Sequence, residues 1–544
     1  MDEAELIDVL LANRGITSTT RAEFLTPSYD NLADPFLLID MQKAVDRLEK
    51  AWQKQESILI YGDYDSDGVT SAALLMTALE KMGFSEITYH LPDRFSEGYG
   101  MNCQAIQTLN PKPDLIITVD CGSLNHAEIA LANELGIDVI VTDHHALGKT
   151  MPAAVAVINP NRLESQYPNR SLAGVGVAFS LVRALQAKLK SWPLGQEKWL
   201  LDLVAIGTIA DLVPLIGENR ILVKYGLLVL AKTRHLGLKY LLSSAKLSTD
   251  NIKTDTVAFG IAPRFNAAGR IETSDLALQI LRASNTEAAR RAVERIEYLN
   301  QKRRALQDKI FAEASEQADK NQESVLILSG RDWHEGVIGI VASKIMETYT
   351  RPTFILQDKG DYLKGSARSF GDFSIAQAIA AVADLLETGG GHKAAGGVKL
   401  KKSNLGEFRR RIYEFYAEQN LTNQLAALKP KVDVILPDLS LLTVNFYHQM
   451  EQLEPFGVGN PEPIFAVNNL RVQKVQKMGQ NSQHLKLFLS DDLGKEMALV
   501  GFNIAEKYRL VTENDVVDVI FNLTLNVWQG KSNVEGRILE IIKK

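Results

Sequence analysis

Residues 57–68 read SILIYGDYDSDG, and this stretch decides the fold because it joins a short apolar run to a dense group of acids. Short β-branched runs bounded by turn residues are typical of buried parallel strands. Two further runs follow the same plan: 114–119 (DLIITV) ends at Asp120, and 137–142 (IDVIVT) ends at Asp143-His144-His145. In open parallel sheets, ligands bind outside the carboxyl ends of the strands. The sequence therefore predicts three strands that deliver carboxylates and imidazoles to one edge of a sheet.

The acids at this edge form a candidate metal site. Asp63, Asp65 and Asp67 lie in what we expect to be an extended loop, where Asp65 and Asp67 point the same way because they are two residues apart. Carboxylates packed this closely raise one another's pKa unless a cation lies among them. A fourth apolar run ends at Asp211 and adds another acid. An Asp-rich turn that caps a helix explains one such acid but not the whole set, so we interpret the set as metal ligands.

The ligand types indicate which ions would bind. Carboxylates with one or two imidazoles, and no cysteine, favour Mn²⁺ or Mg²⁺ over a structural zinc. The set is large enough for two ions, the arrangement that activates water for displacement at phosphorus. Asp143 is expected to orient an imidazole rather than to bind metal itself. The candidate catalytic residues are Asp65, Asp67, Asp120, His144, His145 and Asp211, and the candidate metal ligands are Asp63, Asp65, Asp67, Asp120, His144 and Asp211.

Composition limits the classes of protein to which the chain can belong. Its 544 residues should form roughly three or four domains. No run of about 18 apolar residues predicts a membrane span, and the acidic start, MDEAE, is not that of a signal peptide. Two cysteines cannot make a disulfide framework, and Cys121 has no evident activating partner that would make it a nucleophile. We therefore expect a soluble cytoplasmic protein. The net charge of −6 gives no global indication of nucleic-acid binding, so local patches matter more.

The first half of the chain changes from an α/β pattern to a helical one. Residues 1–43 have the pattern of short helices, and residues 44–215 alternate strand and helix, with helices expected at 69–82 and 124–135. This alternation predicts a parallel sheet with right-handed crossovers. Residues 216–320 lose the strand signal.

A long amphipathic helix is expected at the end of this helical segment. Ser284-Asn285-Thr286-Glu287 matches a capping box, and apolar residues continue behind it at helical spacing as far as Ile310. Between Arg282 and Lys309 the helix carries eight basic residues against four acidic ones. It is either a solvated surface helix or a helix that contacts a nucleic-acid backbone between two domains.

The sequence of the second half of the chain predicts another α/β block, residues 321–425, and a small β-barrel, residues 430–544. In the block, 325–328, 353–356 and 364–368 have strand patterns and 335–347 has a helical one. The last segment contains short alternating runs, which are typical of barrel strands. These runs are 465–472, 484–489, 516–525 and 538–542.

Two arginines are the best candidates for anion binding. Arg94 follows a strand and Arg368 ends one beside Ser366, and arginine suits bidentate contact with phosphate. The stretch 389–397, GGGHKAAGG, is not a P-loop, since no Gly-Lys-Ser/Thr follows a strand. Its glycines still allow a ligand to approach the backbone closely. His392 within this stretch is therefore a candidate phosphate contact.

The ordered set of motifs resembles a known family. Asp143-His144-His145, with Asp65-Ser66-Asp67, Asp120 and Asp211, resembles the DHH phosphoesterase superfamily, and 389–397 resembles its associated DHHA1 domain. Further motifs are similar to those of the bacterial single-strand-specific 5′→3′ DNA exonucleases of that superfamily: 61–70, 94–100, 263–270 (PRFNAAGR) and 453–461 (LEPFGVGNP). The likeness implies an α/β fold with a parallel-sheet DHH domain (44–215), a helical connector with its long helix (216–320), a DHHA1 domain (321–425) and a C-terminal OB-fold barrel (430–544).

The resemblance also implies roles for particular residues. Two divalent ions, Mn²⁺ or Mg²⁺, would bind at the acidic cluster, which Asp63 and His145 complete. Arg94, Ser366 and Arg368 would form the pocket for a 5′-terminal phosphate. Arg264, Asn266, Arg270 and His392 would contact the strand or the scissile phosphate. The OB-fold would hold single-stranded DNA farther along.

One position departs from the family pattern. Many smaller DHH enzymes have a histidine four residues before the first acid of the Asp-x-Asp pair, and this chain has Tyr61 there. Asp63, His145 or water would then have to supply the missing ligand.

The implied activity is metal-dependent hydrolysis of single-stranded DNA from the 5′ end, releasing 5′-mononucleotides in DNA repair and recombination. A single-strand-binding protein and a helicase are expected partners, and we expect a monomer. Two alternatives stay open: a phosphatase of the same superfamily that acts on short oligonucleotides, cyclic dinucleotides or polyphosphate, and a non-catalytic replication scaffold. The predicted barrel and basic helix favour a longer polymer, and the intact acidic cluster disfavours a scaffold.

Overall fold

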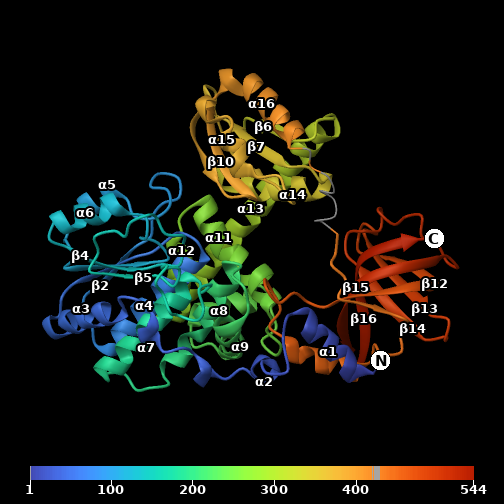
Figure 1. The fold of residues 1–544 in the computed structure, drawn as a ribbon, viewed down its shortest axis with the longest axis horizontal. Helices are drawn as coiled ribbons and strands as arrows, with labels where there is room; N and C mark the ends of the chain where they lie inside the picture. The colour runs from blue at the N-terminus through green and yellow to red at the C-terminus, as the bar shows by residue number, and fades with distance from the viewer. Residues whose placement is uncertain (1, 420, 422–428) are drawn as a thin grey trace.

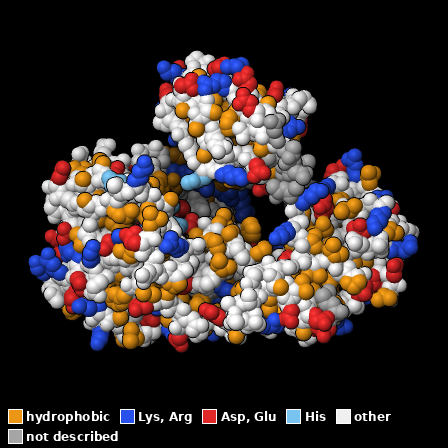
Figure 2. Space-filling view, viewed as in Figure 1, with side chains coloured by type: hydrophobic (Ala, Val, Ile, Leu, Met, Phe, Trp, Pro, Cys, Tyr) orange, Lys and Arg blue, Asp and Glu red, His pale blue; other side chains and the backbone are white. Residues whose placement is uncertain are grey.

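The computed structural model describes residues 2–419, 421 and 429–544, which form three lobes (Figure 1). The space-filling view shows a hollow between these lobes (Figure 2). One lobe contains the N-terminal sheet, a second contains the middle sheet, and the third is a C-terminal β-barrel. No helix in this described part of the chain is both long and apolar enough to cross a membrane. The predicted fold class, two α/β units joined by a long helix and followed by an OB-type barrel, is confirmed.

The first lobe is built on a five-stranded parallel sheet in the order β2-β1-β3-β4-β5. Strands β1 and β3 are buried throughout, which explains their unbroken apolar sequences. Because β1, β3 and β4 are parallel neighbours, their carboxyl ends meet at one edge of the sheet, as predicted. The strands are β1 (Ile58–Tyr61), β2 (Ile87–His90), β3 (Leu115–Val119), β4 (Asp138–Thr142) and β5 (Ala156–Ile158).

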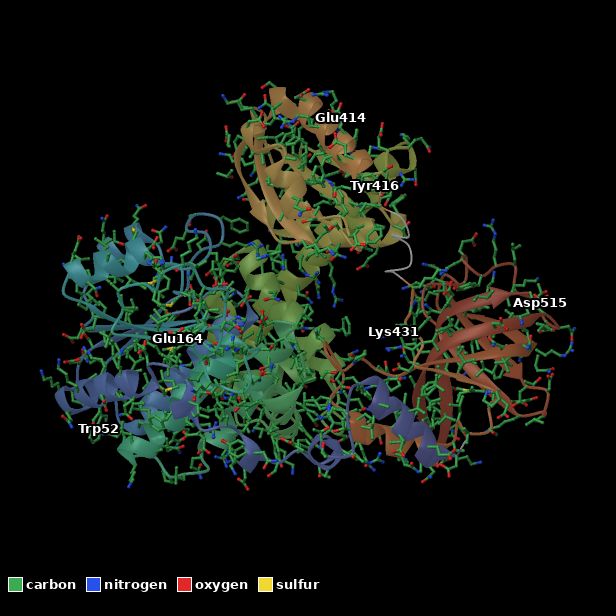
Figure 3. The ribbon with its side chains drawn as sticks, viewed as in Figure 1. Trp52, Glu164, Glu414, Tyr416, Lys431 and Asp515 are labelled. Atoms are coloured by element: carbon green, nitrogen blue, oxygen red, sulfur yellow. The ribbon has the colours of Figure 1, made fainter. Side chains whose placement is uncertain are left out.

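Helices bury both faces of this sheet. One face packs against α3 (Met41–Lys54), α4 (Ser66–Met82) and α7 (Gly174–Leu189), and the other against α5 (Cys103–Gln107) and α6 (His126–Glu134). The Trp52 indole of α3 donates a hydrogen bond of 3.0 Å to the Met82 carbonyl at the end of α4 (Figure 3).

A helical segment connects the first lobe to the second. Its last member, α13, is 34 residues long, and it packs first on α10, α11 and α12 and then, through Ile310 and Ala314, against the second lobe. The helix begins one residue later than predicted, because Asn285 rather than Ser284 caps it and accepts from the Ala288 amide. The helices are α8 (Leu201–Ala210), α9 (Gly217–Leu230), α10 (Leu236–Ser244), the π-helical turn η4 (Thr256–Ile261), α11 (Ala262–Ile271), α12 (Asp275–Leu281) and α13 (Thr286–Asp319).

The second lobe contains a five-stranded sheet in the order β6-β7-β8-β10-β9, parallel only between β6 and β7. Helices α15 (Ile375–Ala380) and α16 (Leu405–Glu418) pack on one face, and α14 (Glu335–Tyr349) packs on the other over β7 and β8. The glycine-rich stretch 389–397 forms the facing ends of β9 and β10. The strands are β6 (Leu326–Gly330), β7 (Thr353–Asp358), β8 (Tyr362–Arg368), β9 (Leu386–Gly391) and β10 (Ala395–Lys401).

The third lobe is a closed barrel, in which β12 pairs with both β13 and β15, and β14 pairs in parallel with β16. Four of its strands extend beyond the predicted runs: β12 (Ile464–Met478), β13 (His484–Ser490), β15 (Val516–Trp528) and β16 (Lys531–Lys543). Strand β14 (Glu496–Gly501) was not predicted; β11 (Val434–Leu436) lies beside β12, with α17 (Val444–Met450) between them in sequence. Lys431 lies on the connection between the second lobe and the barrel (Figure 3). Helix α1 (Glu3–Asn13) buries Leu6 and Leu10 in the barrel's core, so the N-terminus lies beside the barrel (Figure 1).

Candidate active site

The acidic loop after β1 differs from the prediction in one respect. We expected an extended loop and a helix from residue 69, but α4 begins at Ser66. Asp65 is its N-cap and accepts from the Asp67 and Gly68 amides at 2.9 and 3.1 Å, whereas Asp67 lies in the first turn. Asp65 and Asp67 therefore do not share one direction. Asp67 instead accepts from the Gly174 and Val175 amides at 2.7 and 3.0 Å, at the N-terminus of α7, where the helix dipole favours a carboxylate.

Asp120 follows β3 in a left-handed backbone conformation, with φ of 61°. This conformation is uncommon outside glycine and is often found at functional sites. Glycines make room for the carboxylates here: a Cβ atom at Gly174 would lie 2.6 Å from Asp120 Oδ1, and one at Gly207 would lie 2.6 Å from Asp67 Oδ1. The close approach of the carboxylates thus depends on α7 and α8 having no side chain at these points.

Asp143 organises the two histidines after β4. Its carboxylate accepts from the His144 and His145 amides at 2.7 and 3.1 Å, and lies 2.8 Å from His145 Nδ1. Although burial alone would raise it, the hydrogen bonds from His145 hold the pKa of Asp143 well below its usual range. Asp143 is therefore an ionised group that orients the His145 ring and holds the backbone of both histidines. None of the candidate metal-ligand groups found among the described residues contains it.

Three overlapping groups of side-chain atoms could each hold a cation. They are Asp63, Asp65 and Asp120; Asp120, His144 and His145; and Asp67, His144 and Asp211, with the donor atoms of each group within 4.8 Å of one another. Asp120 and His144 each belong to two groups, so the groups form one continuous cluster. Asp211 reaches this cluster from the C-terminal end of α8, not from a strand.

Unpartnered atoms show that this cluster fits a cation. Within the described residues, Asp63 Oδ1, Asp120 Oδ1 and His144 Nε2 are buried without a hydrogen-bond partner, although such atoms are almost always satisfied in native proteins. The Asp120 and His144 atoms lie 3.1 Å apart. Hard oxygen donors with an imidazole suit Mn²⁺ or Mg²⁺.

The pKa values of these side chains also indicate a cation site. Burial, followed by the neighbouring carboxylates, raises the pKa of Asp67 and of Asp120 well above the usual value. Burial and then the charge of Asp65 raise the pKa of Asp63 to about 8 and that of Asp211 to about 7. Burial and the charge of His145 lower the pKa of His144 to about 4, so its imidazole is neutral and able to ligate.

Four arginines form a positive cluster beside the acids: Arg94, Arg270, Arg303 and Arg368. Burial, and then the charges of Arg94, Arg303 and Arg368, lower the pKa of Arg270 to about 10. None of the ion pairs found among the described residues involves any of these four side chains. Arg94 stacks over the ring of Tyr64, a residue of the acidic loop, at 5.1 Å. Figure 2 shows Lys and Arg side chains gathered in the hollow between the lobes.

The remaining predicted residues occupy different surroundings. Ser366 lies beside Arg368: a Cβ atom at Gly339 of α14 would be 3.4 Å from Ser366 Oγ and 3.2 Å from Arg368 Nη2. The Asn266 side-chain oxygen Oδ1 accepts from the Ser66 amide and hydroxyl at 3.0 and 2.9 Å, which ties α11 to the acidic loop. Arg264 pairs with Glu297 at 2.8 Å, and His392 is exposed at the turn after β9.

Several residues at the site were missed from the sequence. Arg303 of α13 joins the arginine cluster, and its position on the apolar stripe of that helix was an available signal. Tyr99 places its hydroxyl 2.9 Å from His145 Nδ1 and 3.2 Å from the Asp120 carbonyl, to which it donates. Asn159 and Asn161 donate to the carbonyls of His145 and His144, a contact that no local pattern indicates.

Comparison with known proteins agrees with this architecture. Three segments match domain families described as DHH family, N-terminal domain (57–208), DHHA1 domain (322–418) and RecJ OB domain (432–540). The chain is 36% identical over 533 residues to the single-stranded-DNA-specific exonuclease RecJ of Bacillus subtilis, covering 97% of this chain and 66% of that protein. It is 34% identical to the RecJ of Dickeya dadantii, covering 97% of this chain and 94% of that one.

The chain belongs to the RecJ family. Solved RecJ structures from Thermus thermophilus share its fold: the complex with Mn²⁺ gives a TM-score of 0.85 at 30% identity, covering 98% of this chain and 75% of that one. The complex with Mg²⁺ gives a TM-score of 0.78 at 28% identity, covering 98% and 74%. RecJ of Bacillus subtilis extends well beyond the length that this chain matches, whereas RecJ of Dickeya dadantii is matched almost throughout.

Proposed function

We propose that this chain is a metal-dependent exonuclease that hydrolyses single-stranded DNA from the 5′ end and releases 5′-mononucleotides. The observation that carries the proposal is the adjacency of two clusters: unpartnered buried carboxylates with a neutral imidazole, and four arginines that form no ion pair within the described residues. The first suits divalent cations and the second suits phosphates. Relatives named for exonuclease activity on single-stranded DNA support the substrate class.

Two divalent ions, Mn²⁺ or Mg²⁺, would share the acidic cluster. Asp63, Asp65 and Asp120 would hold one, and Asp67, His144 and Asp211 the other, because these are two of the groups whose donor atoms converge. The buried Tyr61 occupies the position where smaller relatives have histidine, and Asp63 would take over that ligand's part. When bound, such ions supply an activated water and offset negative charge at the reacting phosphate.

The protein's own side chains would set the polarity of attack. Arg94, Ser366 and Arg368 would grip the 5′-terminal phosphate, and the neighbouring phosphodiester would then face the acidic cluster. Arg270, with Arg264, Asn266 and His392 around it, would steady the strand. His145, held by Asp143 and close to Tyr99, would contact the scissile phosphate. Each cycle would thus shorten the strand by one nucleotide from its 5′ end.

Contacts between the first two lobes support a preference for single strands. Arg270 of α11, a helix of the connecting segment that shares the core of the first lobe, donates to the Gly336 carbonyl of α14 at 3.2 Å. The Phe95 and His334 rings meet edge to face at 5.9 Å. The lobes therefore touch beside the cluster, which would leave a passage for one strand and not for a duplex. We further propose that the barrel holds the trailing strand, and that the chain acts as a cytoplasmic monomer beside a single-strand-binding protein and a helicase.

Two variants test the proposal. Asp120→Ala should lower turnover more than about a hundredfold while circular dichroism stays unchanged, and Asp138→Asn, at the opposite edge of the same sheet, should keep full activity. Arg368→Ala should weaken binding of 5′-phosphorylated strands about tenfold and leave 5′-hydroxyl strands nearly unaffected. Retained turnover in Asp120→Ala, or equal loss on both kinds of end in Arg368→Ala, would contradict the assignment.

A further inference from the structure

The second lobe carries a groove that the proposed activity does not use. It has a volume of about 680 Å³ and lies on the face of β8, β10 and β9 next to α14, where Phe95 of the first lobe forms one wall. Along β8 the side chains alternate, so Lys364, Ser366 and Arg368 share this face. The groove therefore begins beside the proposed pocket for the 5′-terminal phosphate and continues from it along the strand.

Two glycines keep the floor of the groove bare. Gly390 and Gly397 are cross-strand partners, and Gly397 is opposite Ser366. A Cβ atom at Gly390 would meet nothing within 4 Å, and one at Gly397 would meet only the Gly365 carbonyl at 3.8 Å. Neither glycine has a positive φ. By contrast, a Cβ atom at Gly396 would lie 2.7 Å from the Ile375 side chain. Packing requires glycine at 396 but not at 390 or 397, so the bare floor leaves room for something outside the fold.

The walls of the groove carry excess positive charge. Its lining contains the three lysines Lys359, Lys364 and Lys399 and the single carboxylate Glu335. Lys364 pairs with Glu335 at 3.0 Å and Lys399 with Glu387 at 2.8 Å, with both lysine side chains more than a third exposed. Exposed ion pairs of this kind contribute little, so phosphate oxygens can replace these partners. Lys364 and Lys399 face each other across the strands, which lets them hold one anionic group between them.

The groove continues along β8 away from Arg368, because Lys364 and Gly365 are among its lining residues and Ser366 and Arg368 are not. Lys364 lies two residues before Ser366 in β8, which places it about 7 Å from Ser366 along the strand. We propose that this groove binds the additional phosphates of a 5′-triphosphate, so that strands with triphosphate ends are accepted as substrates. This inference rests on the proposed function, because it takes Ser366 and Arg368 as the site of the first phosphate.

Binding of three short oligothymidylates tests the inference. They differ only in the 5′ end, which is a hydroxyl, a monophosphate or a triphosphate, and binding is measured with the full chain in EDTA so that none is cleaved. We expect the triphosphate strand to bind about five- to tenfold more tightly than the monophosphate strand. The double variant Lys364→Ala/Lys399→Ala should remove that difference and leave monophosphate binding unchanged, and Lys364→Arg/Lys399→Arg should restore it.

A matched control uses Lys402→Ala. Lys402 is an equally exposed lysine of the same lobe, paired with Asp358 at 2.7 Å but outside the groove, and its loss should keep the triphosphate preference. Equal or weaker binding of the triphosphate strand by the wild-type chain overturns the inference, and so does a preference that survives in the double alanine variant. The proposed phosphate pocket is judged separately, by the comparison of monophosphate with hydroxyl ends: if those two bind equally, the pocket itself is refuted.

Discussion

At the scale of single residues, the acidic cluster has a cost for the folded protein. Asp120 is buried in a strained backbone conformation with an unpartnered carboxylate oxygen, next to the unpartnered nitrogen of His144. Leaving such a buried polar atom unpaired costs about 1–3 kcal/mol. In the absence of a cation, Asp63, Asp67 and Asp211 add mutual repulsion to that cost. Affinity for metal and stability without metal are thus opposed at the same atoms.

This opposition predicts how stability depends on pH. The folded-state pKa of Asp63 is about 8 and that of Asp211 about 7, against 3.8 for an ordinary aspartate. Groups whose pKa is raised on folding stabilise the protein below the ordinary pKa, and that contribution is lost as the pH rises through the folded-state pKa. In EDTA, the free energy of unfolding should therefore fall as the pH rises from about 4 to about 8. The fall is about 1.4 kcal/mol per pH unit for each proton that is released when the chain unfolds.

Thermal unfolding across this pH range, with and without Mn²⁺, measures the effect. Mn²⁺ should raise the midpoint more at the alkaline end, because protons no longer compete for the carboxylates. Asp120→Asn should make the metal-free chain more stable and its pH dependence shallower. A metal-free midpoint that stays constant over the range would refute the linkage.

At the scale of elements, the sequence was a good guide wherever a pattern reports burial. The apolar runs of β1, β3 and β4 predicted strands because these strands are buried on both faces, and the shared edge followed from their being parallel. The start of α4 was missed because Asp65 both caps the helix and belongs to the acidic cluster, and a turn rich in aspartate fits either pattern. The apolar stripe of α13 indicates that Arg303 is buried, but its neighbours depend on how the helix packs between two lobes, which a local pattern does not report.

A buried arginine lies at the joint between the first lobe and the barrel. Arg220 of α9 is 2% exposed, stacks 3.9 Å above the Phe24 ring, and donates to the carbonyls of Phe24, Gln452 and Leu453. Burial, and then the charge of Arg14, lower its pKa to about 10, so it remains charged. It ties α2 (Arg21–Leu25) and the segment before the barrel to the first lobe.

Replacing this arginine should therefore loosen the joint. Arg220→Met keeps the apolar volume but removes a donor from three buried carbonyls, although that of Leu453 keeps Asn460 as a second donor. We expect a loss of about 3 kcal/mol in the free energy of unfolding, with faster proteolysis near residue 453. Arg234→Met is the matched control, since Arg234 is an arginine that stacks on Trp199 at 3.6 Å, and it should cost less than about 1 kcal/mol. Equal losses for the two variants would show that the joint does not depend on Arg220.

At the scale of the whole molecule, charge is organised locally although the total is −6. The acids lie together at one edge of the first sheet. The arginines that surround them come from the first two lobes and from the helices between them. Four arginines that neutralise phosphates of a single strand should give log K against log salt a slope of about −3. Arg303→Gln should make that slope shallower by about 0.7 and weaken binding to all sequences alike.

The salt slope is measured by fluorescence anisotropy with labelled oligonucleotides of mixed sequence. Arg290→Gln, on the exposed side of the same helix, where Arg290 pairs with Glu287 and Glu294, should leave the slope unchanged. An Arg303→Gln slope identical to that of the wild-type chain would exclude Arg303 from the strand-binding surface.

Cleavage of end-labelled single strands tests the central claim most directly. Single-stranded DNA labelled at the 5′ or at the 3′ end is incubated with the chain in Mn²⁺, Mg²⁺ or EDTA. We predict immediate release of labelled mononucleotide from the 5′ end in at least one of the metals, persistence of the 3′ label in progressively shorter strands, and no reaction in EDTA. Early loss of the 3′ label, internal cuts, or no cleavage of the long strand in either metal would contradict a metal-dependent 5′→3′ exonuclease.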